Sequence, residues 1–79
     1  MAKPFLGHME DLRKTVARNL RRLRQEKGWS QEELAFRAEV DRSYISMLET
    51  GNSYSATITM LGKLAAALEI EPVELLTRK

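Results

Sequence analysis

The sequence predicts an all-α fold, a compact bundle of five helices without strands. Apolar residues recur three or four positions apart in several stretches, which is the period of a helix with one buried face. Residues that start and stop helices stand at the ends of these stretches. A chain of 79 residues allows one domain only, and no internal repeat divides it.

The first predicted helix begins at Glu10. Its apolar stripe has spacings of four, four and three, and consists of Leu12, Val16, Leu20 and Leu23. Gly28 then ends the helix, because glycine readily adopts the left-handed backbone conformation that follows many helices. Residues 1–9 contain a proline and a glycine and show no helical period. We interpret them as a flexible leader before a domain that spans residues 10–79.

The second helix has a complete start signal. Ser30 is an N-cap residue, and Glu33, three positions later, completes a capping box. Trp29 and Leu34 stand at the two positions of a hydrophobic staple. We therefore predict that this helix begins at Gln31, and that Trp29 is a structural residue rather than one that stacks on a base.

The third helix follows across a short joint. Asp41 is its predicted N-cap, and Val40 and Ile45 provide a second staple. The helix is expected to end near Thr50, before Gly51. We assign the Asp41 carboxylate to this capping role.

Two more helices complete the predicted bundle. Residues 52–56 form a polar loop, and Thr57 is the expected cap of the fourth helix. The apolar stripe of that helix consists of Ile58, Leu61, Leu64, Ala65 and Leu68. Pro72 suits the first position of a short fifth helix, whose apolar residues are Val73, Leu75 and Leu76.

Charge is distributed unevenly along the chain, although the net charge is only +2. Residues 13–27 hold seven basic side chains against Glu26 alone, whereas residues 69–76 hold three glutamates and no base. One end of the molecule should therefore attract a polyanion. A solvated helix face is an alternative that the charges alone leave open.

The composition argues against several kinds of site. There is no cysteine, and His8 is the single histidine, so no disulfide, metal site or cofactor is expected. With no second histidine, Gly-rich phosphate loop or paired carboxylates, an enzyme is not expected. No apolar run approaches the roughly 18 to 20 residues of a membrane span, and a signal peptide is not recognisable. We expect a cytoplasmic protein without a membrane contact.

The third helix carries unusual residues away from its core. At about 100° per residue, Ile45 and Leu48 lie at the centre of its buried face. The opposite side holds small, polar or uncharged side chains, namely Ser43, Ser46, Met47 and Thr50. Such side chains suit a helix that enters a groove lined with the hydrogen-bonding edges of bases. An ordinary surface helix is the competing interpretation.

The middle of the chain matches a known pattern through Gln31, Leu34, Ala35, Ala38, Ile45, Leu48, Glu49 and Gly51. With these residues, and with its ending "LEIEPVELL", the chain resembles the helix-turn-helix domain of phage repressors and Cro proteins. This broad family comprises the xenobiotic-response-element-type bacterial regulators and has the lambda-repressor-like fold. The resemblance runs from about Val16 to Leu76. Within the family the chain is similar to controller proteins of restriction-modification systems and to stand-alone phage-type repressors.

One residue departs from the family pattern. Glu39 stands at the turn position that the family fills with glycine. A left-handed conformation costs a residue with a Cβ about 1 kcal/mol, so we expect a strained or altered turn.

The resemblance implies double-stranded DNA as the partner, without a small-molecule effector. Base contacts are implied for Arg42, Ser43 and Met47. Phosphate contacts are implied for Gln31, Tyr44, Ser46, Asn52, Ser53, Tyr54 and Ser55. Arg24 is implied to pair with Glu49 and to hold the first helix to the third.

The acidic end offers apolar residues for self-association. A small core should cover Ile70, Val73 and Leu76 only in part. A two-fold dimer through this end would present its two third helices about 34 to 36 Å apart, one turn of DNA. We therefore expect a DNA-binding transcriptional regulator that binds a near-palindromic operator as a homodimer, with its third helix in the major groove. The alternative is an antitoxin-type protein-interaction module that also binds DNA.

Overall fold

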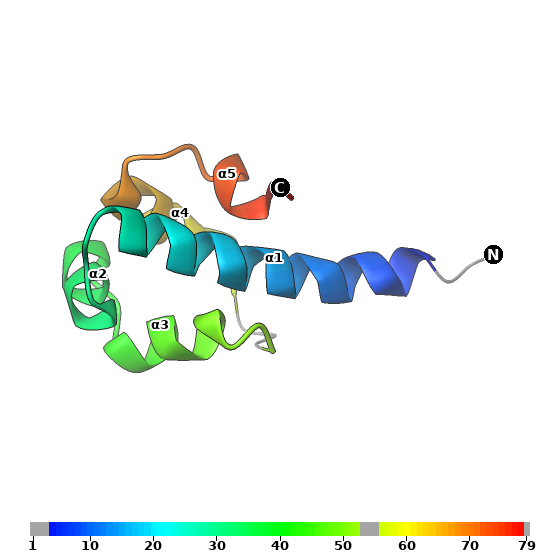
Figure 1. Cartoon of the computed structure of the whole chain (residues 1–79), viewed down its shortest axis with the longest axis horizontal. Coiled ribbons are helices and arrows are strands. Elements are labelled where there is room, and N and C mark those ends of the chain that lie inside the picture. The colour runs from blue at the N-terminus through cyan, green and yellow to red at the C-terminus, as the bar shows by residue number, and fades with distance from the viewer. Residues whose placement is uncertain (1–3, 53–55, 79) are drawn as a thin grey trace.

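The computed structural model describes residues 4–52 and 56–78, with side chains from residue 12 onward. Within these ranges it contains no strand and five helices: α1 (Pro4–Glu26), α2 (Gln31–Ala38), α3 (Arg42–Glu49), α4 (Ile58–Leu68) and α5 (Val73–Leu76). In Figure 1, α1 crosses the molecule, α3 lies below it, and α4 and α5 lie above it. The predicted all-α fold of five helices is confirmed.

The first helix begins earlier than predicted, at Pro4 rather than at Glu10. Proline suits the first position of a helix, where its missing N–H would have no partner within the helix. Gly7, inside the helix, costs only about 1 kcal/mol relative to alanine. The prediction that residues 4–9 precede the helix is therefore wrong, whereas the division into a leader and a domain stays a prediction.

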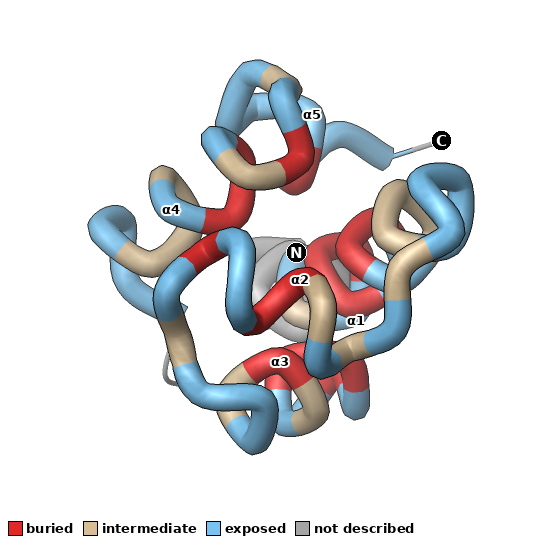
Figure 2. Tube along the Cα trace, turned by 90° about the vertical axis from the view of Figure 1, so that its left-hand side faces the viewer, coloured by how far each residue is buried: buried red, intermediate tan, exposed pale blue. Residues whose placement is uncertain are grey.

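The core lies where the five helices meet. Its fully buried large side chains come from every one of them, and are Leu20, Leu34, Ile45, Leu64, Leu68 and Leu75. Figure 2 shows the buried segments of the helices turned toward a common centre. Leu12 differs from the rest of its predicted stripe, because it is 44% exposed. The amino-terminal part of α1 extends beyond the other helices (Figure 1).

The predicted N-caps differ in the use of their side chains. The Ser30 hydroxyl accepts a hydrogen bond from the Glu33 N–H at 3.0 Å, and the Thr57 hydroxyl accepts one from the Met60 N–H at 3.1 Å. Asp41 has the backbone conformation of an N-cap, but its side chain makes no capping hydrogen bond. The capping role predicted for this carboxylate is therefore wrong. The residue is exposed, so water can solvate the carboxylate and the free N–H groups of the first turn.

Trp29 packs against the core at the start of α2. The Arg37 guanidinium lies over its ring, 4.4 Å from the centroid, and also pairs with Glu33 at 2.6 Å. The Glu33 carboxylate is thus directed along α2 toward Arg37, rather than back toward Ser30 as a reciprocal capping box requires. These contacts support the structural role predicted for Trp29.

The turn between α2 and α3 contains the left-handed residue expected at its position. Glu39 has φ 60° and ψ 45°, and its N–H donates to the carbonyl oxygens that end α2. Glu69 ends α4 in the same conformation, with φ 60° and ψ 43°. Each of these glutamates costs about 1 kcal/mol relative to glycine.

A buried amide holds α5 against α1. Asn19 is 3% exposed, and its Nδ2 donates to the carbonyl oxygens of Leu75 and Thr77, both at 2.9 Å. A longer contact of 3.3 Å joins the same nitrogen to the carbonyl oxygen of Glu74. The last carbonyl groups of a helix have no donor within it, and a helix this short is unstable alone. Asn19 therefore supplies the donor that α5 lacks.

Replacing Asn19 by alanine should lower the free energy of unfolding by about 1 to 3 kcal/mol, because buried carbonyl oxygens lose their donor. Urea denaturation followed by circular dichroism measures the change. The control is Gln25→Ala, which removes an exposed amide from the same helix and should change stability by less than about 0.5 kcal/mol. Equal, small effects in both variants would show that Asn19 does not hold α5.

Candidate nucleic-acid interface

The outward face of α3 carries the residues for which base contacts were predicted. Ile45 is fully buried and Leu48 is 3% exposed, so they fix the inward side of the helix. Arg42 and Ser43 are exposed, and Met47 is 38% exposed. A helix held by its inward side in this way presents short and hydrogen-bonding side chains to solvent.

Tyr44 connects α3 to the start of α4. Its ring packs against the core. Burial raises the pKa of its hydroxyl, and a hydrogen bond with the Thr57 backbone offsets only part of that rise. Tyr44 is therefore anchored, unlike the exposed residues beside it. The predicted phosphate contact at Tyr44, and that at the half-buried Ser46, stay predictions.

The turn after α3 contains another predicted phosphate contact, Asn52, which is exposed. Its backbone N–H donates to the Thr50 hydroxyl at 3.1 Å, and that hydroxyl donates to the Met47 carbonyl oxygen at 2.7 Å. Arg13 of α1 donates to the Asn52 carbonyl oxygen at 3.4 Å. The other predicted phosphate contacts in this loop lie outside the described residues, and are Ser53, Tyr54 and Ser55.

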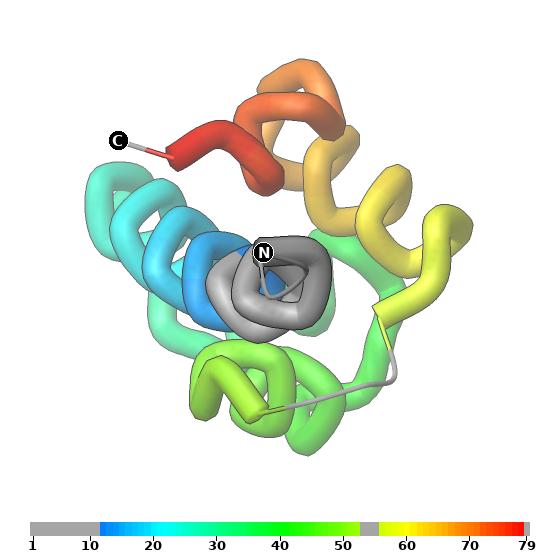
Figure 3. Tube along the Cα trace, turned by 90° about the vertical axis from the view of Figure 1, so that its right-hand side faces the viewer, coloured from blue at the N-terminus to red at the C-terminus, as the bar shows by residue number. Residues whose placement is uncertain are grey.

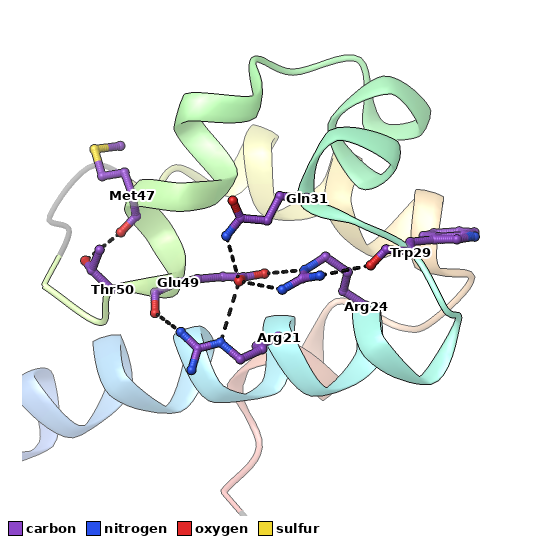
Figure 4. A network of polar contacts seen from close by, with 7 residues as sticks. All are labelled: Arg21, Arg24, Trp29, Gln31, Met47, Glu49 and Thr50. Atoms are coloured by element: carbon purple, nitrogen blue, oxygen red, sulfur yellow. Dashed lines mark hydrogen bonds and ion pairs between the residues drawn. The ribbon is translucent and has the colours of Figure 1, made fainter.

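Three helices meet at one carboxylate, that of Glu49 (Figure 4), whose side chain is 2% exposed. Arg24 of α1 donates to both of its oxygens, from Nε to Oε2 at 2.8 Å and from Nη2 to Oε1 at 2.9 Å. Gln31, the first residue of α2, donates from Nε2 to Oε1 at 3.0 Å. Arg24 also donates from Nη1 to the Trp29 carbonyl oxygen at 2.9 Å. The network therefore joins α1, α2, α3 and the turn between the first two.

Arg21 completes this network, and sequence reasoning did not single it out. Its Nε lies 3.6 Å from Oε1 of Glu49, and its Nη2 donates to the Glu49 carbonyl oxygen at 3.0 Å. Arg21 precedes Arg24 by three positions, so the two share one side of α1. The spacing of three positions indicates that Arg21 and Arg24 lie on the same side of the helix. It does not indicate which glutamate they contact, because that depends on the packing of α1 against α3.

Opposing effects act on the Glu49 carboxyl. Burial raises its pKa. Hydrogen bonds from Arg24 and Gln31 and the charges of Arg24 and Arg21 lower the pKa by more than burial raises it, so the pKa lies below its ordinary value. The pKa of Arg24 is raised, chiefly by its hydrogen bond to Glu49. Both partners are therefore charged at neutral pH.

The Gln31 side chain forms a hydrogen bond within the protein, in addition to the phosphate contact predicted for it. One hydrogen of its amide nitrogen points to Glu49. An amide nitrogen carries two hydrogens, so the second can donate to a phosphate. The first N–H groups of α2 also lack partners within the helix, as at every helix start. The phosphate contact at Gln31 stays a prediction.

In the described ranges, 4–52 and 56–78, no helix is long and apolar enough to cross a membrane. Nor do they contain a group of three or more acidic, histidine or cysteine side chains that could hold a metal ion.

A family model described as helix-turn-helix, HTH_3, matches residues 20–75. A hypothetical transcription factor of Neisseria meningitidis is 42% identical over 67 residues, which are 85% of this chain and 62% of that protein. The chain thus spans less than two thirds of the length of this relative. The HTH-type transcriptional regulator y4dJ of Sinorhizobium fredii is 45% identical over 67 residues, which are 86% of its length and 85% of this chain.

Among solved structures, the chain is similar to the restriction-modification controller protein C.AhdI from Aeromonas hydrophila. The TM-score is 0.75 at 44% identity, and the match covers 80% of this chain and 94% of the controller protein. These relatives are transcription regulators and a controller protein by name, and the likeness extends over all the helices that surround Glu49.

Replacing Glu49 by glutamine should lower the free energy of unfolding at pH 7 by about 3 to 5 kcal/mol, because a buried ion pair loses one charge. Since folding lowers the pKa of Glu49, its contribution is fully present above the unfolded pKa of about 4.3 and is lost as the pH falls through the folded value. The difference between wild type and variant should therefore shrink below about pH 4. Urea denaturation at a series of pH values measures it.

The matched control is Glu26→Gln, which breaks a pair with Arg22 whose glutamate side chain is 61% exposed. This variant should lose less than about 1 kcal/mol. If Glu49→Gln were no more destabilised than Glu26→Gln, the buried network would not hold the three helices together.

Proposed function

The chain belongs to the helix-turn-helix family HTH_3, and from this membership we propose that it is a sequence-specific transcriptional regulator. It binds a near-palindromic operator as a homodimer, with α3 in the major groove. The observation that carries the proposal is the outward face of α3, where Arg42, Ser43 and Met47 are exposed while Ile45 and Leu48 are buried. This helix exposes hydrogen-bonding and small side chains where base edges would lie.

Each exposed residue of α3 has its own chemistry toward a base. The Arg42 guanidinium at the start of α3 can donate two parallel hydrogen bonds to O6 and N7 of a guanine. The Ser43 hydroxyl can donate or accept, and the Met47 side chain suits the methyl group of thymine. Base discrimination would thus come chiefly from Arg42, since a bidentate contact with guanine discriminates against the wrong base by about 1 to 3 kcal/mol.

Phosphate contacts fix the position of α3 in the groove. Gln31 donates through its second amide hydrogen, and the free N–H groups at the start of α2 favour an anion. The other phosphate contacts, away from the start of α2, come from Tyr44, Ser46 and Asn52. Contacts of this kind position a protein on the duplex without carrying sequence information.

The dimer forms through the end of the chain that carries α5. Val73 is 61% exposed and Leu76 is 37% exposed, while Ile70 is partly buried against the core. Pairing this surface around a two-fold axis removes its apolar area from water and presents two copies of α3 to successive major grooves.

Replacing Arg42 by alanine should cost about 1 to 3 kcal/mol of binding free energy on the operator and relax the preference at one base pair in each half-site. Replacing Gln31 by alanine should instead weaken binding to all sequences by a similar factor. Binding to a panel of operators with each position substituted in turn distinguishes the two. Stability must be measured beside it, because Gln31 also contacts Glu49.

A uniform loss of affinity in Arg42→Ala, with the preference profile unchanged, would contradict the base contact. Arg42 would then reach sideways to a phosphate. Specificity would in that case lie in Ser43, Met47 or the shape of the DNA.

Replacing Val73 by aspartate should convert the dimer to a monomer and weaken operator binding, because a charge is placed in an apolar interface. Analytical ultracentrifugation at tens of micromolar measures the first effect and a mobility shift measures the second. Phe36→Asp is the control, since Phe36 is even more exposed, at 79%, and lies on α2. A wild type that is strictly monomeric, or a Val73→Asp variant with unchanged DNA affinity, would refute the proposed dimer.

A further inference from the structure

Basic residues of α1 line the side of that helix next to α3. At about 100° per residue, Lys14, Arg18 and Arg21 fall within one narrow sector of α1. We name this sector the basic edge. Figure 3 shows α3 below α1. The basic edge is exposed, and the proposed base and phosphate contacts do not use it.

Two contacts place the basic edge beside the carboxyl end of α3. Arg21, with a side chain 54% exposed, donates to the carbonyl oxygen of Glu49, the last residue of α3, at 3.0 Å. Gly51 packs directly on α1, since a Cβ at this glycine would lie 3.6 Å from Cγ of Lys14. The turn that follows α3 is therefore in contact with the basic edge.

The basic edge also continues the line of the proposed phosphate contact at Gln31. Nε2 of Gln31 and Nε of Arg21 approach the same oxygen of Glu49, at 3.0 Å and 3.6 Å (Figure 4). Lys14 lies two helical turns, about 11 Å, further along α1. A row of hydrogen-bond donors thus runs from the start of α2 past Arg21 to Lys14, beside the carboxyl end of α3.

Most of the charge of this row has no ion-pair partner among the described side chains. The Glu49 carboxylate is 2% exposed and already paired with Arg24, so it does not neutralise Arg21 toward solvent. Among the described residues, Lys14 and Arg18 form no ion pair. Arg22, next to Arg21 in sequence, differs, because its guanidinium contacts Glu26 and Asn19, both at 3.3 Å.

We propose that the basic edge of α1 binds phosphates of the DNA strand that Gln31 also contacts. α1 then holds the DNA backbone beside the carboxyl end of α3, with Arg21 next to Gln31 and Lys14 beside the turn at Gly51. The contacts are electrostatic and independent of sequence, and they release counterions when they form. The inference rests on the proposed function, because it assigns residues of α1 to the same DNA-bound state.

The test compares Lys14→Ala with the matched control Arg22→Ala, which removes one positive charge from the same helix. Binding is measured at several salt concentrations, on an operator selected from random duplexes and on a mixed-sequence duplex. In Lys14→Ala the slope of log K against log salt should become less steep by about 0.9, the value for one phosphate contact. Both duplexes should lose affinity by the same factor. Arg22→Ala should retain the wild-type slope, and Lys14→Arg should restore it.

Equal slopes in Lys14→Ala and in wild type would overturn the inference, while binding by the wild type would leave the proposed function intact. An equal decrease in Lys14→Ala and Arg22→Ala would also overturn it, since a general effect of net charge would then explain both. A wild type that binds neither duplex at any salt concentration would overturn the proposed function itself. Lys14 is the better test residue than Arg21, because Arg21 also stabilises the fold through Glu49.

Discussion

The arrangement of the helices depends on the burial of one ionised carboxylate, that of Glu49. A buried charge is strongly unfavourable unless charged and hydrogen-bonding partners surround it. Here the partners are Arg21 and Arg24 from α1 and Gln31 from the start of α2, while Glu49 itself ends α3. Because these partners come from different helices, satisfying the carboxylate restricts how the helices can lie relative to one another. The orientation of the proposed base-contacting face is thus set by a group that lies behind that face.

The long helix α1 connects this network to the opposite end of the molecule. On one side of α1, Arg21 and Arg24 hold α3; on another, Asn19 holds the carboxyl end of α5. Figure 3 shows α3 and α5 on opposite sides of α1. In a two-fold dimer through α5, the distance between the two copies of α3 would depend on this one helix, which is rigid because its backbone hydrogen bonds are internal.

The sequence could predict those features that depend on neighbouring residues. The apolar stripes and the caps at Ser30 and Thr57 follow from spacings of three or four residues, and the structure confirms them at most positions. The first residue of two predicted stripes is wrong: Leu12 is 44% exposed and Ile58, at the start of α4, is 89% exposed, because neither end is covered by another helix. The clamp at Asn19 could not be predicted, because its acceptors lie 55 to 58 positions away and depend on how α5 packs. The sequence predicts too late a start for α1, because Pro4 and Gly7 suggest breaks at positions where the helix tolerates both residues. The pairing of Arg24 with Glu49 came from the family resemblance, not from the residues alone.

Acidic and basic side chains lie on different sides of the molecule. The exposed glutamates Glu69, Glu71 and Glu74 lie around the start of α5, and the basic edge lies next to α3 on another side of α1. Only Glu69 among the three forms an ion pair in the described structure, with Lys27 at 3.2 Å, and its side chain is 80% exposed. The basic edge would therefore attract a polyanion and the glutamates around α5 would repel it, over distances of about one Debye length, roughly 8 to 10 Å. In the proposed DNA-bound state, this asymmetry favours an approach of the DNA from the side of the basic edge and leaves the surface proposed for dimerisation free.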